Sequence, residues 1–202
     1  MTSEVMLNEN LIALPAVAGV NFRGYRGESD LPHMLAVING AKAVDGDERS
    51  ETLAEITWNY AHLTNCDPQR DLILAEAGGQ VVGYSRVTWW DENGGDWIYL
   101  HFGFVLPAWR GKGIGSAMLS FCQERLRQIA AEQVALGKRP ANAPAYFQVG
   151  ANNSDLATTR LVEENGFQPV RRHYTMLRPD LENIPEVHLP QGVEVRPVDW
   201  QA

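Results

Sequence analysis

The stretch that decides the fold is VLPAWRGKGIGS, residues 105–116. Its glycines stand at alternate positions: Gly111, Gly113 and Gly115. The first turn of a helix has backbone N–H groups without partners and carries a partial positive charge. Glycines let an anion approach these groups closely, and Arg110 and Lys112 add positive charge. The stretch therefore predicts a phosphate-binding loop at the start of a helix.

Two common phosphate-binding motifs do not fit this stretch. A Walker A loop needs Gly-Lys followed by Ser or Thr, whereas Lys112 is followed by Gly113. A dinucleotide-binding fingerprint needs Gly-x-Gly-x-x-Gly, and Ser116 occupies its last glycine position. Both alternatives fail because the spacing is wrong.

The loop is flanked by two predicted strands and a predicted helix. Trp97–Val105 is almost wholly apolar, which is typical of a strand buried on both faces. A helix is expected from the loop to near Gly137, because apolar residues recur at helical spacing: Ile114, Ala117, Met118, Phe121, Cys122, Leu126, Ile129 and Ala130. Ala145–Val149 is expected to be the next strand. Strand, loop, helix and strand form a βαβ unit.

The remaining segments extend this unit. The glycines Gly78-Gly79 predict a hairpin between two strands. Asp30 and Ser50 each begin a helical pattern, and Asp155 or Ser154 caps a helix that ends at Gly166. Further strands are expected at Val20–Tyr25, Leu72–Ala77, Val81–Trp89 and Phe167–Leu177. We therefore predict an α/β (α+β) fold with a mixed, mostly antiparallel sheet of six to seven strands and helices on both faces. Residues 1–19 are predicted to be an N-terminal arm.

Composition narrows the class of partner. The net charge of −8 disfavours nucleic acid or an anionic membrane as the main partner. No basic run precedes an apolar stretch at the N-terminus, and no apolar run is long enough to span a bilayer. We therefore expect a cytoplasmic protein. The two cysteines, Cys66 and Cys122, do not support a disulfide framework, and we expect no metal site.

The pattern from Val105 to Gly115 resembles the pyrophosphate loop of the GNAT superfamily of N-acetyltransferases, Arg/Gln-x-x-Gly-x-Gly/Ala. The segment from Ala75-Glu76 to Val82-Gly83-Tyr84 resembles that family's second and third strands. Gly166-Phe167, followed by Arg171, Tyr174 and Met176, resembles its last helix turn and strands. The resemblance covers roughly residues 20–178 and implies the acyl-CoA N-acyltransferase fold for this segment.

The resemblance implies an acetyl-CoA-dependent enzyme that acetylates a primary amine by direct attack on the thioester. The acceptor is expected to be a small molecule, and the protein a monomer or homodimer. The backbone of Gly103, Phe104 and Val105 would pair with the pantetheine arm, and the Val105 N–H would polarise the thioester carbonyl. Asn153 would also contact the pantetheine. The pyrophosphate would lie on Arg110, Gly111, Lys112, Gly113, Ile114, Gly115 and Ser116.

The sequence departs from the family pattern at two catalytic positions. Val162 stands where the usual tyrosine acid is found, and Gln148 where some members place a catalytic glutamate. An alternative alignment puts Asp155 rather than Asn153 at the asparagine position. His101 is a candidate base and Tyr174 a candidate acid, although His101 and its neighbour on the same face, Tyr99, can equally be hydrogen-bonded core residues. The rival function is a non-catalytic acyl-CoA-binding domain, the structural or regulatory half of a tandem protein.

Two further features leave alternatives open. Trp89, Trp90 and Trp97 flank the turn Asn93-Gly94-Gly95 and either line an acceptor pocket or simply pack a hairpin. Residues 189–199 follow a proline-containing linker and echo the segment from Leu14 to Arg23. We expect residues 179–202 to be a linker and the first strand of a second domain of a tandem protein. The alternative is a C-terminal arm that packs on its own domain or on a second copy.

Overall fold

The computed structural model describes residues 2–7, 10–46, 50–174, 176, 178–186 and 188–197. The chain divides into two units, residues 1–168 and residues 169–202, and each is described by itself. Every helix and strand found among the described residues lies in the first unit. None of these helices is both long enough and apolar enough to cross a membrane.

The first unit is built on a five-stranded sheet with the order β3-β4-β5-β6-β7. The strands are β3 (Asn21–Gly24), β4 (Leu72–Ala77), β5 (Gln80–Asp91), β6 (Trp97–Val105) and β7 (Ala145–Val149). All neighbours pair antiparallel except β6 and β7, which are parallel. The predicted mixed, mostly antiparallel sheet is confirmed, although it has fewer strands than expected.

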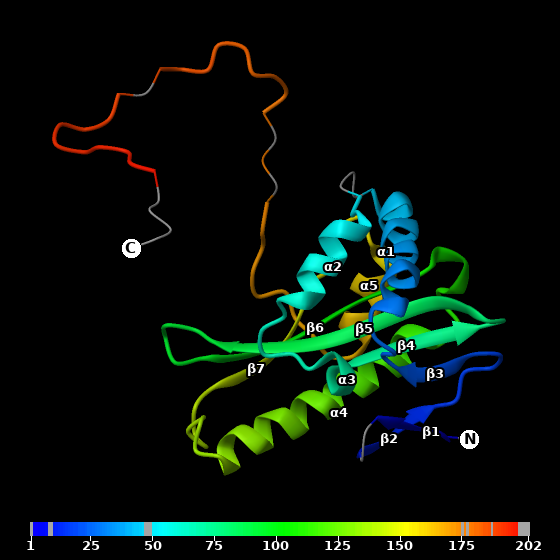
Figure 1. Ribbon diagram of the computed structural model, residues 1–202. Helices are drawn as coiled ribbons and strands as arrows, with labels where there is room; N and C mark the ends of the chain where they lie inside the picture. The colour runs from blue at the N-terminus through cyan, green and yellow to red at the C-terminus, as the bar shows by residue number, and fades with distance from the viewer. Residues whose placement is uncertain are drawn as a thin grey trace. The chain divides into compact units, whose positions relative to one another are not determined.

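Helices cover both faces of this sheet (Figure 1). They are α1 (Leu31–Asp45), α2 (Leu53–Ala61), the short α3 (Pro68–Asp71), α4 (Ile114–Ala135) and α5 (Leu156–Glu164). One apolar cluster joins α1 and α2 to residues such as Leu72 and Tyr84 on one face. Helix α2 begins at a capping box, in which Thr52 and Glu55 each accept the other's backbone N–H.

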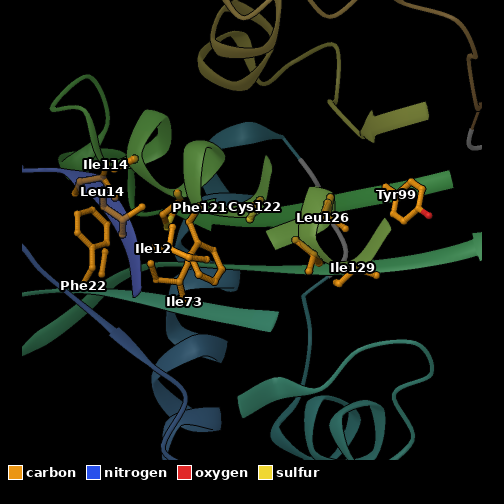
Figure 2. Packing of buried hydrophobic residues seen from close by; sticks show 14 of the residues in the cluster. Ile12, Leu14, Phe22, Ile73, Tyr99, Ile114, Phe121, Cys122, Leu126 and Ile129 are labelled. Carbon is orange, nitrogen blue, oxygen red and sulfur yellow. The ribbon is translucent and has the colours of Figure 1, made fainter. Parts of the chain in front are cut away.

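A second apolar cluster lies on the opposite face, against α4 (Figure 2). Phe121, Cys122 and Leu126 of α4 are buried there beside Ile73 of β4, as their helical spacing predicts. The thiol of Cys122 has its pKa raised to about 12 by burial, so it stays protonated and behaves as a small apolar group.

The N-terminal segment differs from the predicted arm. Strands β1 (Thr2–Leu7) and β2 (Asn10–Pro15) pair antiparallel. Ile12 and Leu14 of β2 are buried in the α4-side cluster (Figure 2). Their alternation places both side chains on one face of the strand, a signal too short to separate a hairpin from an arm.

The predicted strand Phe167–Leu177 is wrong over its described part, because residues 167–174 form no strand. Pro169 has no N–H to donate to a strand ladder, and the side chains of Val170 and Tyr174 further along this segment are exposed. Residues 175 and 177 lie outside the described residues. The predicted sheet therefore ends at β7 in the first unit.

Candidate active site

The strands β6 and β7 part halfway along β6. Their pairing runs from Trp97–Ala145 to His101–Val149, and β6 continues alone on that side to Val105. The N–H of Leu106 donates to the carbonyl of Val82 on the β5 side. Because backbone groups alternate along a strand, the N–H of Val105 points to the other side, where β7 has ended. This edge of β6 offers backbone groups to an extended ligand.

Gly103 is needed for β6 to lie close against β5 over the same residues that form the open edge. A Cβ atom at Gly103 would stand 2.7 Å from Ser85 Oγ and 2.7 Å from the carbonyl oxygen of Tyr84. The Ser85 hydroxyl donates to the carbonyl of Phe102 at 3.0 Å, which holds the two strands together. A side chain at residue 103 would push β6 away from β5 and move the open edge.

The glycine loop ends at the start of α4, as predicted. Gly111 and Gly113 have φ of 71° and 89°, in the left-handed region that favours glycine. Within the described part of the chain, no side chain caps α4, and Ala117 is the first residue whose N–H bonds back, to the carbonyl of Gly113. The N–H groups of the first turn therefore remain available, which is the arrangement that binds phosphate.

Arg110 has a different place from the predicted phosphate contact. Its two terminal nitrogens lie 2.6 and 2.7 Å from the carboxylate oxygens of Asp45, at the end of α1, and its Nε donates to the carbonyl of Val105 at 3.0 Å. The hydrogen bonds with Asp45 raise the pKa of Arg110. Lys112 lies over the ring of Trp109, 4.4 Å from its centroid. Arg110 thus braces the loop against α1 and the end of β6.

The candidate acid and base lie in different units. His101 of β6 is 9% exposed, and its Nδ1 has no hydrogen-bond partner among the described residues. Burial lowers the pKa of His101 to about 4. The neighbouring Tyr99 donates to Gln133 of α4 and accepts from Arg139, so it belongs to a buried polar network. Tyr174 lies in the second unit and is exposed.

The turn between β7 and α5 holds Asn153 and Asp155, the two residues that alternative alignments place at the family's asparagine position. Asn153 is exposed in this turn, and Asp155 caps α5 by accepting the N–H of Thr158 at 3.0 Å. Gln148 lies in β7, paired with Leu100, and Val162 lies in α5. No group of three or more potential metal ligands occurs among the residues that the structure describes.

A cavity of about 650 Å³ lies on the sheet face that α1 and α2 cover. Its lining includes Trp58 and Tyr60 of α2, Arg86 and Trp90 of β5, and Phe102 of β6. Trp89 also contributes, whereas Trp97 stacks on Trp89 and lies in the α4-side core. The sequence analysis named two of these tryptophans but missed Arg86, whose only signal is a charge within an apolar strand pattern.

Comparisons with known proteins agree with this geometry. Residues 39–148 match the Acetyltransferase (GNAT) family, while a sequence comparison with curated proteins found no match. A GCN5-related N-acetyltransferase from Sphaerobacter thermophilus has 24% identity and a TM-score of 0.62 over 78% of this chain; the chain spans 45% of that protein's length. The yncA protein of Salmonella typhimurium, solved with its cofactor acetyl-CoA, has 21% identity and a TM-score of 0.53, covering 74% of this chain and 80% of that one. A predicted acetyltransferase from Clostridium acetobutylicum, solved with acetyl-CoA, has 17% identity and a TM-score of 0.54, covering 78% and 96%. At these identities the similarity shows the fold.

Proposed function

This chain belongs to the Acetyltransferase (GNAT) family, and we propose that it transfers the acetyl group of acetyl-CoA to the primary amine of a small molecule. The observation that carries this proposal is the open edge of β6, which begins where pairing with β7 ends at His101. The uncapped start of α4 follows this strand in the chain. One ligand with an extended arm and a pyrophosphate fits both features. A cavity of about 650 Å³ beside them has the size of a small-molecule site.

In this proposal, acetyl-CoA supplies the thioester, and the chain positions it. The first-turn N–H groups of α4, from Gly113 to Ser116, bind the pyrophosphate. The backbone of Gly103 and Val105 pairs with the pantetheine arm, which Asn153 also contacts. The Val105 N–H lies on the open side of β6 and would stabilise the oxyanion that forms as the amine attacks.

Acetyl transfer to an amine requires two proton transfers. The side chain of His101 lies on the α4 face of β6, opposite the cavity, so it would accept the proton of the amine through a water rather than directly. Tyr174 is our candidate donor to the departing thiolate from the sequence alone. With a pKa of about 4, His101 is neutral at pH 7 and a weak base. It would therefore act on an amine that is already attacking the carbonyl rather than on a free ammonium ion.

The test combines binding and turnover. Isothermal titration calorimetry measures acetyl-CoA binding, and a thiol reagent measures CoA release with a panel of amines. We expect Gly113→Asp to abolish acetyl-CoA binding, because it places a carboxylate at the phosphate position. Gly94→Asp is the control for the added charge, and Gly95→Asp, at φ 86°, is the control for the left-handed backbone of Gly113. Both glycines lie in the exposed β5–β6 turn with open space around the Cβ position.

The rival function predicts a different result. Val162 and Gln148 favour a domain that binds acyl-CoA without catalysis. If acetyl-CoA binds but no amine raises CoA release above hydrolysis, the enzyme proposal fails. If Gly113→Asp binds acetyl-CoA as the Gly94→Asp control does, the proposed cofactor site is wrong.

We further propose that residues 179–202 are a linker and the segment that forms the first strand of a second domain when the rest of that domain is present. The proposal rests on the echo of residues 14–23 in residues 189–199, because residues 189–197 form no strand here. The length of the native reading frame tests this proposal directly.

A further inference from the structure

A guanidinium group lies in the cavity between two aromatic rings. Arg86 projects from β5, and its central carbon is 5.1 Å from the ring centroid of Phe102 and 5.8 Å from that of Tyr60. Both rings also line the cavity. Aromatic faces hold a planar guanidinium in one orientation but do not neutralise its charge.

Arg86 has no anionic partner among the residues that the structure describes. Its Nε and the hydroxyl oxygen of Tyr60 are buried without hydrogen-bond partners there. Burial raises the pKa of Tyr60, and raises that of the nearby Cys66 to about 11, so both groups are neutral at pH 7. Glu51 also lines the cavity, but its carboxylate lies 3.1 Å from Lys42 Nζ.

Arg139 also has a buried Nε without a partner, but its other nitrogens donate to the Tyr99 hydroxyl and the Ala143 carbonyl. Three other arginines of the first unit, with side chains 5–21% exposed, show the contrast. Each is paired with a carboxylate within 2.8 Å: Arg23 with Asp30, Arg110 with Asp45, and Arg125 with Asp71. A buried donor without a partner is costly, and a buried charge more so. The cavity around Arg86 is therefore complementary to an anion that the described chain does not supply.

The cavity also reaches the open edge of β6. Phe102 lines it and is the first residue of β6 beyond the last β6–β7 pair, His101–Val149. A ligand held by Arg86 would therefore lie beside the edge where the thioester is proposed to bind. The remaining walls include Ile56, Trp58 and Trp90, which suit an apolar side chain.

We propose that the acceptor is a small amine that also carries a carboxylate, such as an amino acid with an apolar side chain, and that Arg86 binds this carboxylate. The proposal rests on the proposed acetyltransferase function for the amine's role. Arg86 supplies a planar fork of N–H donors that matches a carboxylate, and such charge-assisted pairs are among the strongest hydrogen bonds. The ring of an aromatic amino acid would pack against the tryptophans.

The experiment measures binding and turnover for matched ligands: L-phenylalanine, L-phenylalaninamide and phenethylamine. Binding is followed by titration calorimetry with CoA present, and turnover by CoA release from acetyl-CoA. We expect phenylalanine to bind about 10- to 100-fold more tightly than the two ligands without a carboxylate. Arg86→Gln should remove this preference, so that phenylalanine binds no more tightly than phenethylamine. Arg127→Gln, on the exposed side of α4, is the matched control and should keep the preference.

The outcomes separate this inference from the proposed function. If amines are acetylated but the wild-type protein binds all three ligands equally, the carboxylate proposal is overturned and the acetyltransferase proposal stands. If nothing is acetylated but phenylalanine binds preferentially through Arg86, the carboxylate site stands and the enzyme proposal fails. The wild-type comparison needs no variant, so a folding defect in Arg86→Gln, checked by thermal unfolding, does not remove the test.

Discussion

Replacing Asp45 by asparagine tests whether Arg110 braces the loop or binds phosphate. Asp45 Oδ1 and Oδ2 accept hydrogen bonds of 2.6 and 2.7 Å from the two terminal nitrogens of Arg110. Asp45→Asn removes the charge and puts an amide donor where one of these oxygens stood. Arg110 then keeps its bond to the carbonyl of Val105 and the more distant carboxylate of Asp155, at 3.9 Å, but loses its closest carboxylate partner.

The expected loss of stability follows from the geometry. Breaking a fully buried ion pair by removing one partner costs about 3–5 kcal/mol. The side chains of Asp45 and Arg110 are 11% and 21% exposed, and solvent screens part of that cost. We therefore expect the free energy of unfolding to fall by about 2 kcal/mol, between the fully buried and the surface values. For a domain of this size, such a loss lowers the Tm by about 4–8 °C.

Acetyl-CoA affinity distinguishes the two roles of Arg110. If Arg110 positions the loop, Asp45→Asn should weaken acetyl-CoA binding by about tenfold, the equivalent of ~1.4 kcal/mol. Thermal unfolding and titration calorimetry measure the two effects, with Asp91→Asn as a control at the exposed end of β5. Unchanged stability, or tighter binding of acetyl-CoA, would refute the bracing role. Tighter binding would mean that Asp45 competes with the phosphate for Arg110, and would favour the phosphate contact expected for Arg110 from the sequence.

Two further changes test the geometry around β6. Gly103→Ala places a Cβ 2.7 Å from Ser85 Oγ, so we expect the free energy of unfolding to fall by about 1–3 kcal/mol, measured by urea unfolding; equal stability would show that β6 shifts at no cost. For His101, burial lowers the folded-state pKa to about 4 from 6.5. The unfolded chain therefore binds the extra proton in this window, and stability is lost as the pH falls from about 6.5 towards 4. His101→Gln should reduce the loss of unfolding free energy between pH 7 and pH 4.5 by up to about 3 kcal/mol, as measured by urea unfolding. An unchanged pH dependence would contradict the buried, neutral state of His101.

Most of the first unit could be predicted because its signals are local. Trp97–Val105 and Ala145–Val149 are confirmed with the predicted bounds, and α4 begins in the glycine loop as expected. An apolar run or a helical period is visible within one segment. The N-terminal hairpin could not be predicted this way, because Ile12 and Leu14 pack in a cluster with α4, which lies far away in the sequence.

The site was predicted less completely because it depends on contacts across the chain. The charge of Arg110 is visible in the sequence, but its partner Asp45 lies 65 residues away in α1. His101 was identified by residue type, whereas its low pKa comes from burial that no single segment reveals. Arg86 was missed for the same reason: whether an arginine is paired depends on residues that only the fold brings near it.

The side chains of β6 point alternately to the two faces of the sheet. Side chains alternate along a strand, so Tyr99 and Val105 belong to the α4-side cluster, while Phe102 and Phe104 pack against the cluster of α1 and α2. The backbone edge between these faces is free only beyond His101, where β7 ends. A thioester lying on that edge would meet an acceptor from the side of Phe102, where the cavity and Arg86 lie. In this proposal, the end of β6–β7 pairing would expose the backbone of β6 to acetyl-CoA and would let the amine acceptor reach the thioester from the cavity.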